Sequence, residues 1–175
     1  MPATTCPTVE LWIRTLPAGE GEEHDELRRR LAALERRGVI ESVRVRTWPH
    51  EVALDEVTAF PAGRRATDGT GADRVDRPRD REIADRVRTF QRWAAREGVT
   101  LPAFHERTTV GVGRMGPEYT ALRLPQTALA VWRDGALRWV APCVEGGSEW
   151  TPMEWVEAAA EGEAPGCETG PRLVV

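Results

Sequence analysis

The three cysteines are a natural starting point for chemistry, because a thiolate is a strong nucleophile. They are Cys6, Cys143 and Cys167, and no two of them form a CxxC pair. Cys143 follows an Ala-Pro pair at the end of an expected strand, with Glu145 close by and no histidine near in sequence. A base to activate the thiol and a second cysteine to resolve a disulfide are both missing. Cys143 is the one catalytic candidate, and its alternative role is packing.

Metal and cofactor chemistry lacks its usual motifs. His24, His50 and His105 are isolated from one another, so no metal-ligand spacing exists. The chain has no GxSxG, Walker or GxGxxG motif, and the glycines of VGVGRMG at 110–116 fall in an expected hairpin without a helix to hold a phosphate. We expect no metal site, no cofactor and no enzyme activity.

Arginine is the most prominent charged residue. All 24 basic residues are arginines, a bias that a GC-rich genome would produce. Five of them fall in residues 25–37: Arg28, Arg29, Arg30, Arg36 and Arg37. Guanidinium groups bind phosphates and guanine edges, so this segment is a candidate DNA-reading helix. Acidic residues at and before its start would repel phosphates: Glu20, Glu22, Glu23, Asp25 and Glu26. The alternative is a solvated arginine face.

The elements that hold these residues alternate between strands and helices. Residues 9–16 alternate Val9, Leu11 and Ile13 with other side chains, which predicts a half-buried strand. Leucines spaced by four and three predict a helix over 25–37 that ends at Gly38, and ESVRVRTW predicts a second strand. Residues 61–81 hold hardly any large apolar side chain and predict a flexible surface loop, followed by a helix over about 80–97.

Strand pairs dominate the second half of the chain. HERTTVGVG and EYTALRL, separated by RMGP, predict one hairpin, and Asp134-Gly135 within residues 124–142 predicts another. Thr151 and Pro152 are typical of the start of a last helix. We predict a single α/β (α+β) domain over residues 8–161, with a mixed β-sheet flanked by helices. Disordered tails are expected at 1–7 and 162–175.

The order β-α-β-(loop)-α-(β-hairpin)-β-β-α resembles a thioredoxin-type fold. This resemblance implies that Pro125 is a cis proline facing the active site. The CxxC motif is absent, because residues 16–23 contain no cysteine. The resemblance therefore implies the fold without disulfide exchange, and a divergent protein of this fold with a reactive Cys143 is our alternative function. Among the aromatic residues, Trp150 and Trp155 are candidates, with Pro125, for lining a pocket or a dimer face.

Composition indicates which kinds of partner the protein can attract. The net charge of −4 gives no overall basic field for nucleic acid or anionic membrane. No apolar run is long enough to cross a bilayer and no secretory signal is visible, so we expect a cytoplasmic protein. The oligomeric state stays open, with a dimer as one alternative.

A resemblance to a known family sharpens this interpretation. The layout VELWIRTL … LERRGVI … FQRWAAREGVTL … TALAVWRDGALRWVAPC is similar to a family of small haloarchaeal proteins labelled as helix-turn-helix domain proteins, from about residue 9 to 160. The resemblance implies DNA binding by a helix in the major groove, with 25–37 as the reader. Strands, and not a second helix, flank that segment. We interpret the protein as non-enzymatic and regulatory, with DNA or a protein as its partner.

Overall fold

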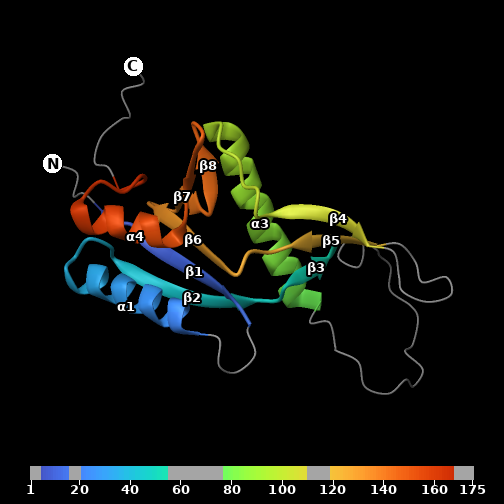
Figure 1. Ribbon diagram of the computed structural model, residues 1–175, viewed down its shortest axis with the longest axis horizontal. Coiled ribbons are helices and arrows are strands. Elements are labelled where there is room, and N and C mark those ends of the chain that lie inside the picture. The colour runs from blue at the N-terminus through green and yellow to red at the C-terminus, as the bar shows by residue number, and fades with distance from the viewer. Residues whose placement is uncertain (1–4, 16–20, 55–76, 110–118, 168–175) are drawn as a thin grey trace.

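Four strands form the central sheet of the computed structural model, which describes residues 5–15, 21–54, 77–109 and 119–167. In order across the sheet they are β2 (Ser42–Trp48), β1 (Thr8–Arg14), β6 (Thr127–Arg133) and β7 (Ala136–Ala141). β1 runs parallel to β2, whereas β6 is antiparallel to its neighbours β1 and β7. The mixed sheet is therefore confirmed, and β1 is an interior strand (Figure 1).

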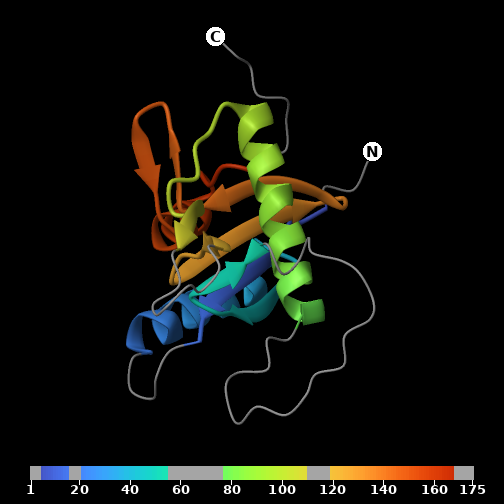
Figure 2. The ribbon, with the colours of Figure 1, turned by 90° about the vertical axis from the view of Figure 1, so that its right-hand side faces the viewer.

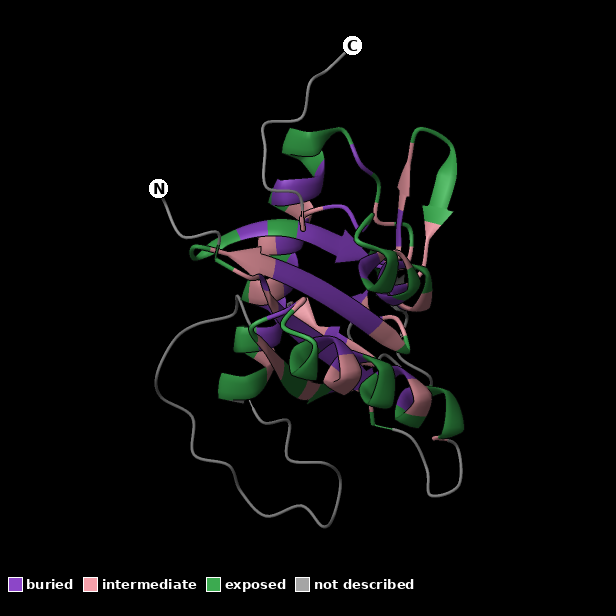
Figure 3. Ribbon diagram, turned by 90° about the vertical axis from the view of Figure 1, so that its left-hand side faces the viewer, coloured by how far each residue is buried: buried purple, intermediate pink, exposed green. Residues whose placement is uncertain are grey.

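Helices cover both faces of this sheet. α1 (Glu22–Arg36) and α4 (Pro152–Glu161) come from opposite ends of the chain and lie side by side on one face (Figures 1 and 3). α3 (Arg77–Glu97) crosses the other face and contacts β7 (Figure 2). Leu27, Leu31 and Leu34 of α1 are buried, as their spacing predicts. None of the helices in the described ranges is long and apolar enough to cross a membrane.

Two smaller sheets extend the domain. β3 (Glu51–Ala53), β5 (Tyr119–Arg123) and β4 (His105–Thr109) form an antiparallel sheet in the order β3-β5-β4. The pairing of β4 with β5 confirms the first predicted hairpin, whose turn lies outside the described residues. β8 (Cys143–Glu145) and β9 (Ser148–Trp150) form a further hairpin that the sequence did not predict.

Local sequence signals account for the best-predicted boundaries. Asp134 and Gly135 join β6 to β7 with φ values of 52° and 73°, the left-handed pair that a two-residue hairpin turn requires. Thr151 caps α4: its hydroxyl accepts from the Glu154 backbone N–H, and the Glu154 side chain accepts from the Thr151 N–H. Gly162 then ends α4 in the left-handed conformation.

Several expectations need correction. The strand β1 is buried on both faces, not half-buried, because it is interior to the sheet and α3 lies over its other side. The helix α3 begins at Arg77, so the end of the predicted loop 61–81 is helical, while 55–76 lies outside the described residues. The cis peptide bond seen in the described ranges is Ala141–Pro142, so the expectation of a cis Pro125 is wrong. A thioredoxin-like identity for the fold stays a prediction.

The predicted tails also pack closer to the domain than expected. After α4, Ala164 and Pro165 are buried, and the Pro165 carbonyl accepts a 2.9 Å hydrogen bond from Trp155 Nε1. At the other end, Pro7 is buried and its carbonyl accepts from the Glu41 N–H at 2.8 Å. Backbone hydrogen bonds and burial therefore attach Pro7 and residues 164–167 to the rest of the described chain.

Candidate functional site

Two of the five predicted α1 arginines serve as structural ties. Arg30 Nη1 lies 3.0 Å from Glu157 Oε1 of α4, and Arg37 Nη2, just beyond the end of α1, donates to the Ala160 carbonyl at 3.1 Å. Arg30 Nε also donates to Glu26 at 2.6 Å, and this hydrogen bond is the largest cause of a lowered pKa at Glu26. Both arginines therefore contact α4 while their side chains stay exposed, and their role as DNA contacts stays a prediction.

The other three α1 arginines are available to solvent. Arg28 and Arg36 are exposed and have no hydrogen bond or ion pair within the described residues. Arg29 pairs with Glu26 at 2.6 Å, but its side chain is 73% exposed, so the pair is worth little. Acidic residues crowd the first turn of the helix: Glu22, Glu23 and Asp25. On α1 the positive charges thus lie on the middle and end of the helix.

The arrangement around α1 differs from a helix-turn-helix unit. α1 follows β1 and precedes β2, and in the described parts of the chain no short turn joins two helices. Its neighbour in space is α4, from the other end of the chain (Figure 3). α4 is therefore the helix that packs beside α1.

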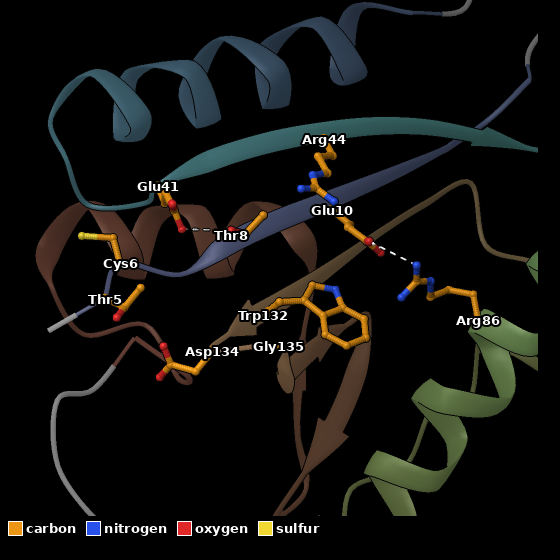
Figure 4. Close-up of a pocket in the computed structure, with 10 residues that line it drawn as sticks. All are labelled: Thr5, Cys6, Thr8, Glu10, Glu41, Arg44, Arg86, Trp132, Asp134 and Gly135. Atoms are coloured by element: carbon orange, nitrogen blue, oxygen red, sulfur yellow. Dashed lines mark hydrogen bonds and ion pairs between the residues drawn. The ribbon is translucent and has the colours of Figure 1, made fainter. Parts of the chain in front are cut away.

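A cavity of about 390 Å³ opens on the opposite face of the sheet, at the end of β1 and the β6–β7 turn (Figure 4). Its floor is Glu10 of β1, only 5% exposed. Arg86 of α3 reaches over the sheet to place Nη2 3.4 Å from Glu10 Oε1, while Trp12 Nε1 lies 3.4 Å from Oε2. Both contacts are long for hydrogen bonds, so the buried carboxylate is only loosely held.

Two donors in this cavity have no acceptor. Arg44 is the cross-strand neighbour of Glu10 on β2, is exposed, and has no ion pair within the described residues. The guanidinium carbon of Arg86 lies 5.0 Å from the ring centroid of Trp132 on β6. The buried indole N–H of Trp132 is unpartnered. Figure 4 shows the nitrogen-bearing edge of this ring turned toward Glu10 and Arg44. The polar groups at this end of the cavity are predominantly donors.

The other end of the cavity is acidic. Glu41, just before β2, accepts from the Thr8 hydroxyl at 3.4 Å, and Asp134 lies at the β6–β7 turn. Figure 4 shows these two carboxylates on the side away from Arg86, beside Cys6. The lining residues thus separate negative from positive charge along the cavity.

A smaller neighbouring cavity of about 280 Å³ differs in that its charges are already paired. Arg46 of β2 lies 2.7 Å from Glu82 and 5.6 Å over the Trp12 ring. Arg79 donates to the Thr47 carbonyl at 3.0 Å and to its hydroxyl at 2.6 Å. These contacts join α3 to β2 and leave little unsatisfied polarity for a ligand.

The sequence matches the model of one family, described as a helix-turn-helix domain, over residues 2–164. The chain belongs to this helix-turn-helix domain family. No curated protein and no solved structure matches it. The resemblance noted from the sequence is thereby confirmed for the family, and the haloarchaeal source stays a prediction.

In this helix-turn-helix domain protein Cys143 is a core residue. Its side chain is fully buried in β8. Burial, and after it the charge of Glu145, raise the pKa of Cys143 from 9.0 to about 12. A thiol with this pKa is almost entirely protonated at neutral pH, which argues against the reactive cysteine of the alternative function.

The three predicted pocket residues each contact a different part of this protein. The Pro125 carbonyl accepts from Trp48 Nε1 at 3.0 Å. Trp150 packs edge-on against Trp139 with ring centroids 5.8 Å apart, and Trp155 is fully buried beneath Pro165. None of these three lines the two cavities described above.

The residues that sequence reasoning missed are those of the larger cavity. Glu10, Arg86 and Trp132 come from β1, α3 and β6, and each looks unremarkable in its own element. The one available signal was a charged residue within the strongly apolar run VELWI, which marks a carboxylate that an interior strand would bury.

Proposed function

We propose that this protein is a non-catalytic regulator that binds duplex DNA through the outer surface of α1. The observation that carries the proposal is the helix-turn-helix family match over residues 2–164. Proteins with such domains read DNA by placing a helix in the major groove. The alternative, redox chemistry at Cys143, has no observation in its favour, because that thiol is buried and protonated.

The geometry of α1 supports this function in two ways. The helix has 15 residues, about 22 Å of length, which is enough to lie along several base pairs. Arg28, Arg29 and Arg36 stay exposed, while Arg30 ties the helix to α4. Because α1 is already held in place by α4, binding in the groove costs less conformational entropy than it would for a mobile helix.

The acidic first turn of α1 restricts how DNA approaches. Glu22, Glu23 and Asp25 repel phosphates, so contact falls on the middle and C-terminal half of the helix. Because the protein is acidic overall, this contact depends on a few local arginines rather than on net charge. Removing the exposed arginines of α1 should therefore weaken DNA binding, whereas removing arginines elsewhere should not.

The experiment measures fluorescence anisotropy of random-sequence duplex DNA over a range of salt concentrations. The test variant is Arg28→Ala/Arg29→Ala/Arg36→Ala, and the matched control is Arg88→Ala/Arg92→Ala/Arg96→Ala on exposed positions of α3. Both remove three positive charges. The α1 variant should reduce the slope of log affinity against log salt by about 2 to 3, since each phosphate contact contributes about 0.9.

The control variant should keep the slope and affinity of the parent protein. Equal losses in the two variants would mean that binding follows net charge, and α1 would not be the reader. Absence of binding at every salt concentration, by protein whose circular dichroism and melting are those of a folded chain, would overturn DNA binding itself.

A further inference from the structure

We propose that the cavity between β1, α3 and the β6–β7 turn binds a small zwitterion, an amino acid with its carboxylate at the Arg44–Trp132 end and its ammonium group at the Glu41–Asp134 end. This ligand site goes beyond DNA binding. It is built by side chains from β1, β2, β6, the β6–β7 turn and α3, which only the folded chain brings together (Figure 4).

The carboxylate end is defined by donors without acceptors. Trp132 carries a buried, unpartnered indole N–H, and a buried donor of this kind costs about 1–3 kcal/mol unless an acceptor reaches it. Arg44 adds a guanidinium that has no ion pair within the described residues. Glu10 neutralises Arg86 at 3.4 Å, so the three charged groups leave one net positive charge for an anion.

The ammonium end is defined by carboxylates. Glu41 and Asp134 carry two negative charges into the cavity wall, and no arginine among the lining residues pairs with either of them. The Thr8 hydroxyl, which donates to Glu41 at 3.4 Å, can also accept from an ammonium group. A purely anionic ligand would meet these carboxylates unfavourably, and a purely cationic one would meet Arg44 and Arg86.

The size of the cavity restricts the ligand. A volume of about 390 Å³ is at the small end of ligand sites and has room for a whole amino acid. The opposite charges lie at separate ends, so an amino acid whose two groups are spaced by methylenes fits better than one that carries both on a single carbon. The structure therefore favours an ω-amino acid.

Isothermal titration calorimetry of the full chain without DNA tests this site. The probes are glycine, β-alanine, γ-aminobutyrate and δ-aminovalerate, with butyrate and butylamine as probes that carry one charge each. At least one of the three longer amino acids should bind tenfold or more tightly than butyrate, butylamine and glycine. Because no duplex is present, failure here and failure of DNA binding are separate results.

Two conservative variants locate the binding. Trp132→Phe keeps the ring beneath Arg86 and removes the N–H donor, and Asp134→Asn keeps a residue that tolerates the positive φ while removing the charge. Each should weaken the bound amino acid at least fivefold. The matched controls are Trp150→Phe and Asp25→Asn, which lie outside the cavity and should leave the affinity unchanged.

Three results would overturn the proposal. One is no binding heat from any of the amino acids with protein that melts cooperatively. Another is binding of butyrate or butylamine as tight as that of the best amino acid. The third is an affinity that Trp132→Phe and Asp134→Asn leave unchanged, or that the control variants reduce equally.

Discussion

One face of the central sheet is apolar beneath α1 and α4, whereas the other face carries charged and aromatic side chains beneath α3. On β1 the same seven residues supply both: Leu11 points to the first face and Glu10 to the second. Leu11 is paired in register with Leu129 of β6, and both are fully buried. The difference shows that burial alone does not separate structural from ligand-binding positions, since Glu10 is nearly as inaccessible as its neighbours.

The covering helices explain this difference. α1 and α4 bring stripes of mostly apolar buried residues, such as Leu31 and Trp155, to that face. α3 buries Val87 and Phe90 against the sheet and also extends Arg86 toward β1. The cavity lies beside Arg86, at the β6–β7 end of the sheet. We infer that the α3 face combines apolar packing with the unpartnered indole N–H of Trp132, whereas the α1–α4 face is mainly an apolar layer.

The largest expected effect is on the free energy of unfolding. Leu129→Ala should lower it by about 2 to 5 kcal/mol, because the side chain is fully buried in the apolar layer. Glu10→Gln should lower it by about 1 kcal/mol or less, because it keeps the shape of the side chain and loses only a long contact to Arg86. Urea denaturation followed by circular dichroism measures both changes.

The comparison between the two faces depends on how much more unfolding free energy Leu129→Ala loses than Glu10→Gln. Val156→Ala on α4, a buried residue of the same apolar layer, should resemble Leu129→Ala with a smaller loss. A Glu10→Gln loss as large as that of Leu129→Ala would contradict the division, and would mean that the Glu10–Arg86 pair is a main stabilising contact of the domain.

A smaller difference should appear between the thiol of Cys143 in the core and the thiol of Cys6 at the cavity. Cys143 is buried in the apolar core with a pKa of about 12, whereas Cys6 lines the cavity and is half-buried. At neutral pH the thiolate fraction of Cys143 is roughly a thousandfold below that of a thiol with a pKa of 9.0. Native protein treated with iodoacetamide should therefore gain label at Cys6 long before Cys143.

Peptide mapping by mass spectrometry gives the rate at each cysteine in one sample. In denaturant the three cysteines should react at similar rates, which provides the control for intrinsic reactivity. Rapid native labelling of Cys143 would contradict its burial and would restore the redox alternative as the leading function.

Sequence patterns predicted the elements better than their environment. Leucine spacing located α1, and Asp134-Gly135 located the β6–β7 hairpin, because both signals depend only on neighbouring residues. The alternation of β1 predicted which residues share a face, but not that α3 would bury Glu10. The cavity was not predictable, because Arg86 and Trp132 meet only through the strand order and the path of α3.

The α1 arginines illustrate the same limit. Their clustering was visible in the sequence, but which of them contact α4 was not. Arg30 and Arg37 meet α4, which is distant in the chain, whereas Arg28 meets solvent. Helix periodicity gives the direction of each side chain, and only the packing of α4 decides which of those directions is occupied.

The smallest expected effect is a pH dependence at the far end of the polar face. Arg14 follows Glu10 and Trp12 on the same side of β1, and its charge acts on His50. Burial, followed by the charges of Arg14 and Arg123, lowers the pKa of His50 below its usual 6.5. The unfolded chain then binds the proton more readily than the folded one, so the free energy of unfolding should fall as the pH drops from 6.5 through the lowered pKa of the folded state. His50→Gln should remove this part of the pH dependence. Urea titrations of both proteins between neutral and mildly acidic pH measure the difference, and parallel curves would mean that the arginines do not act on His50.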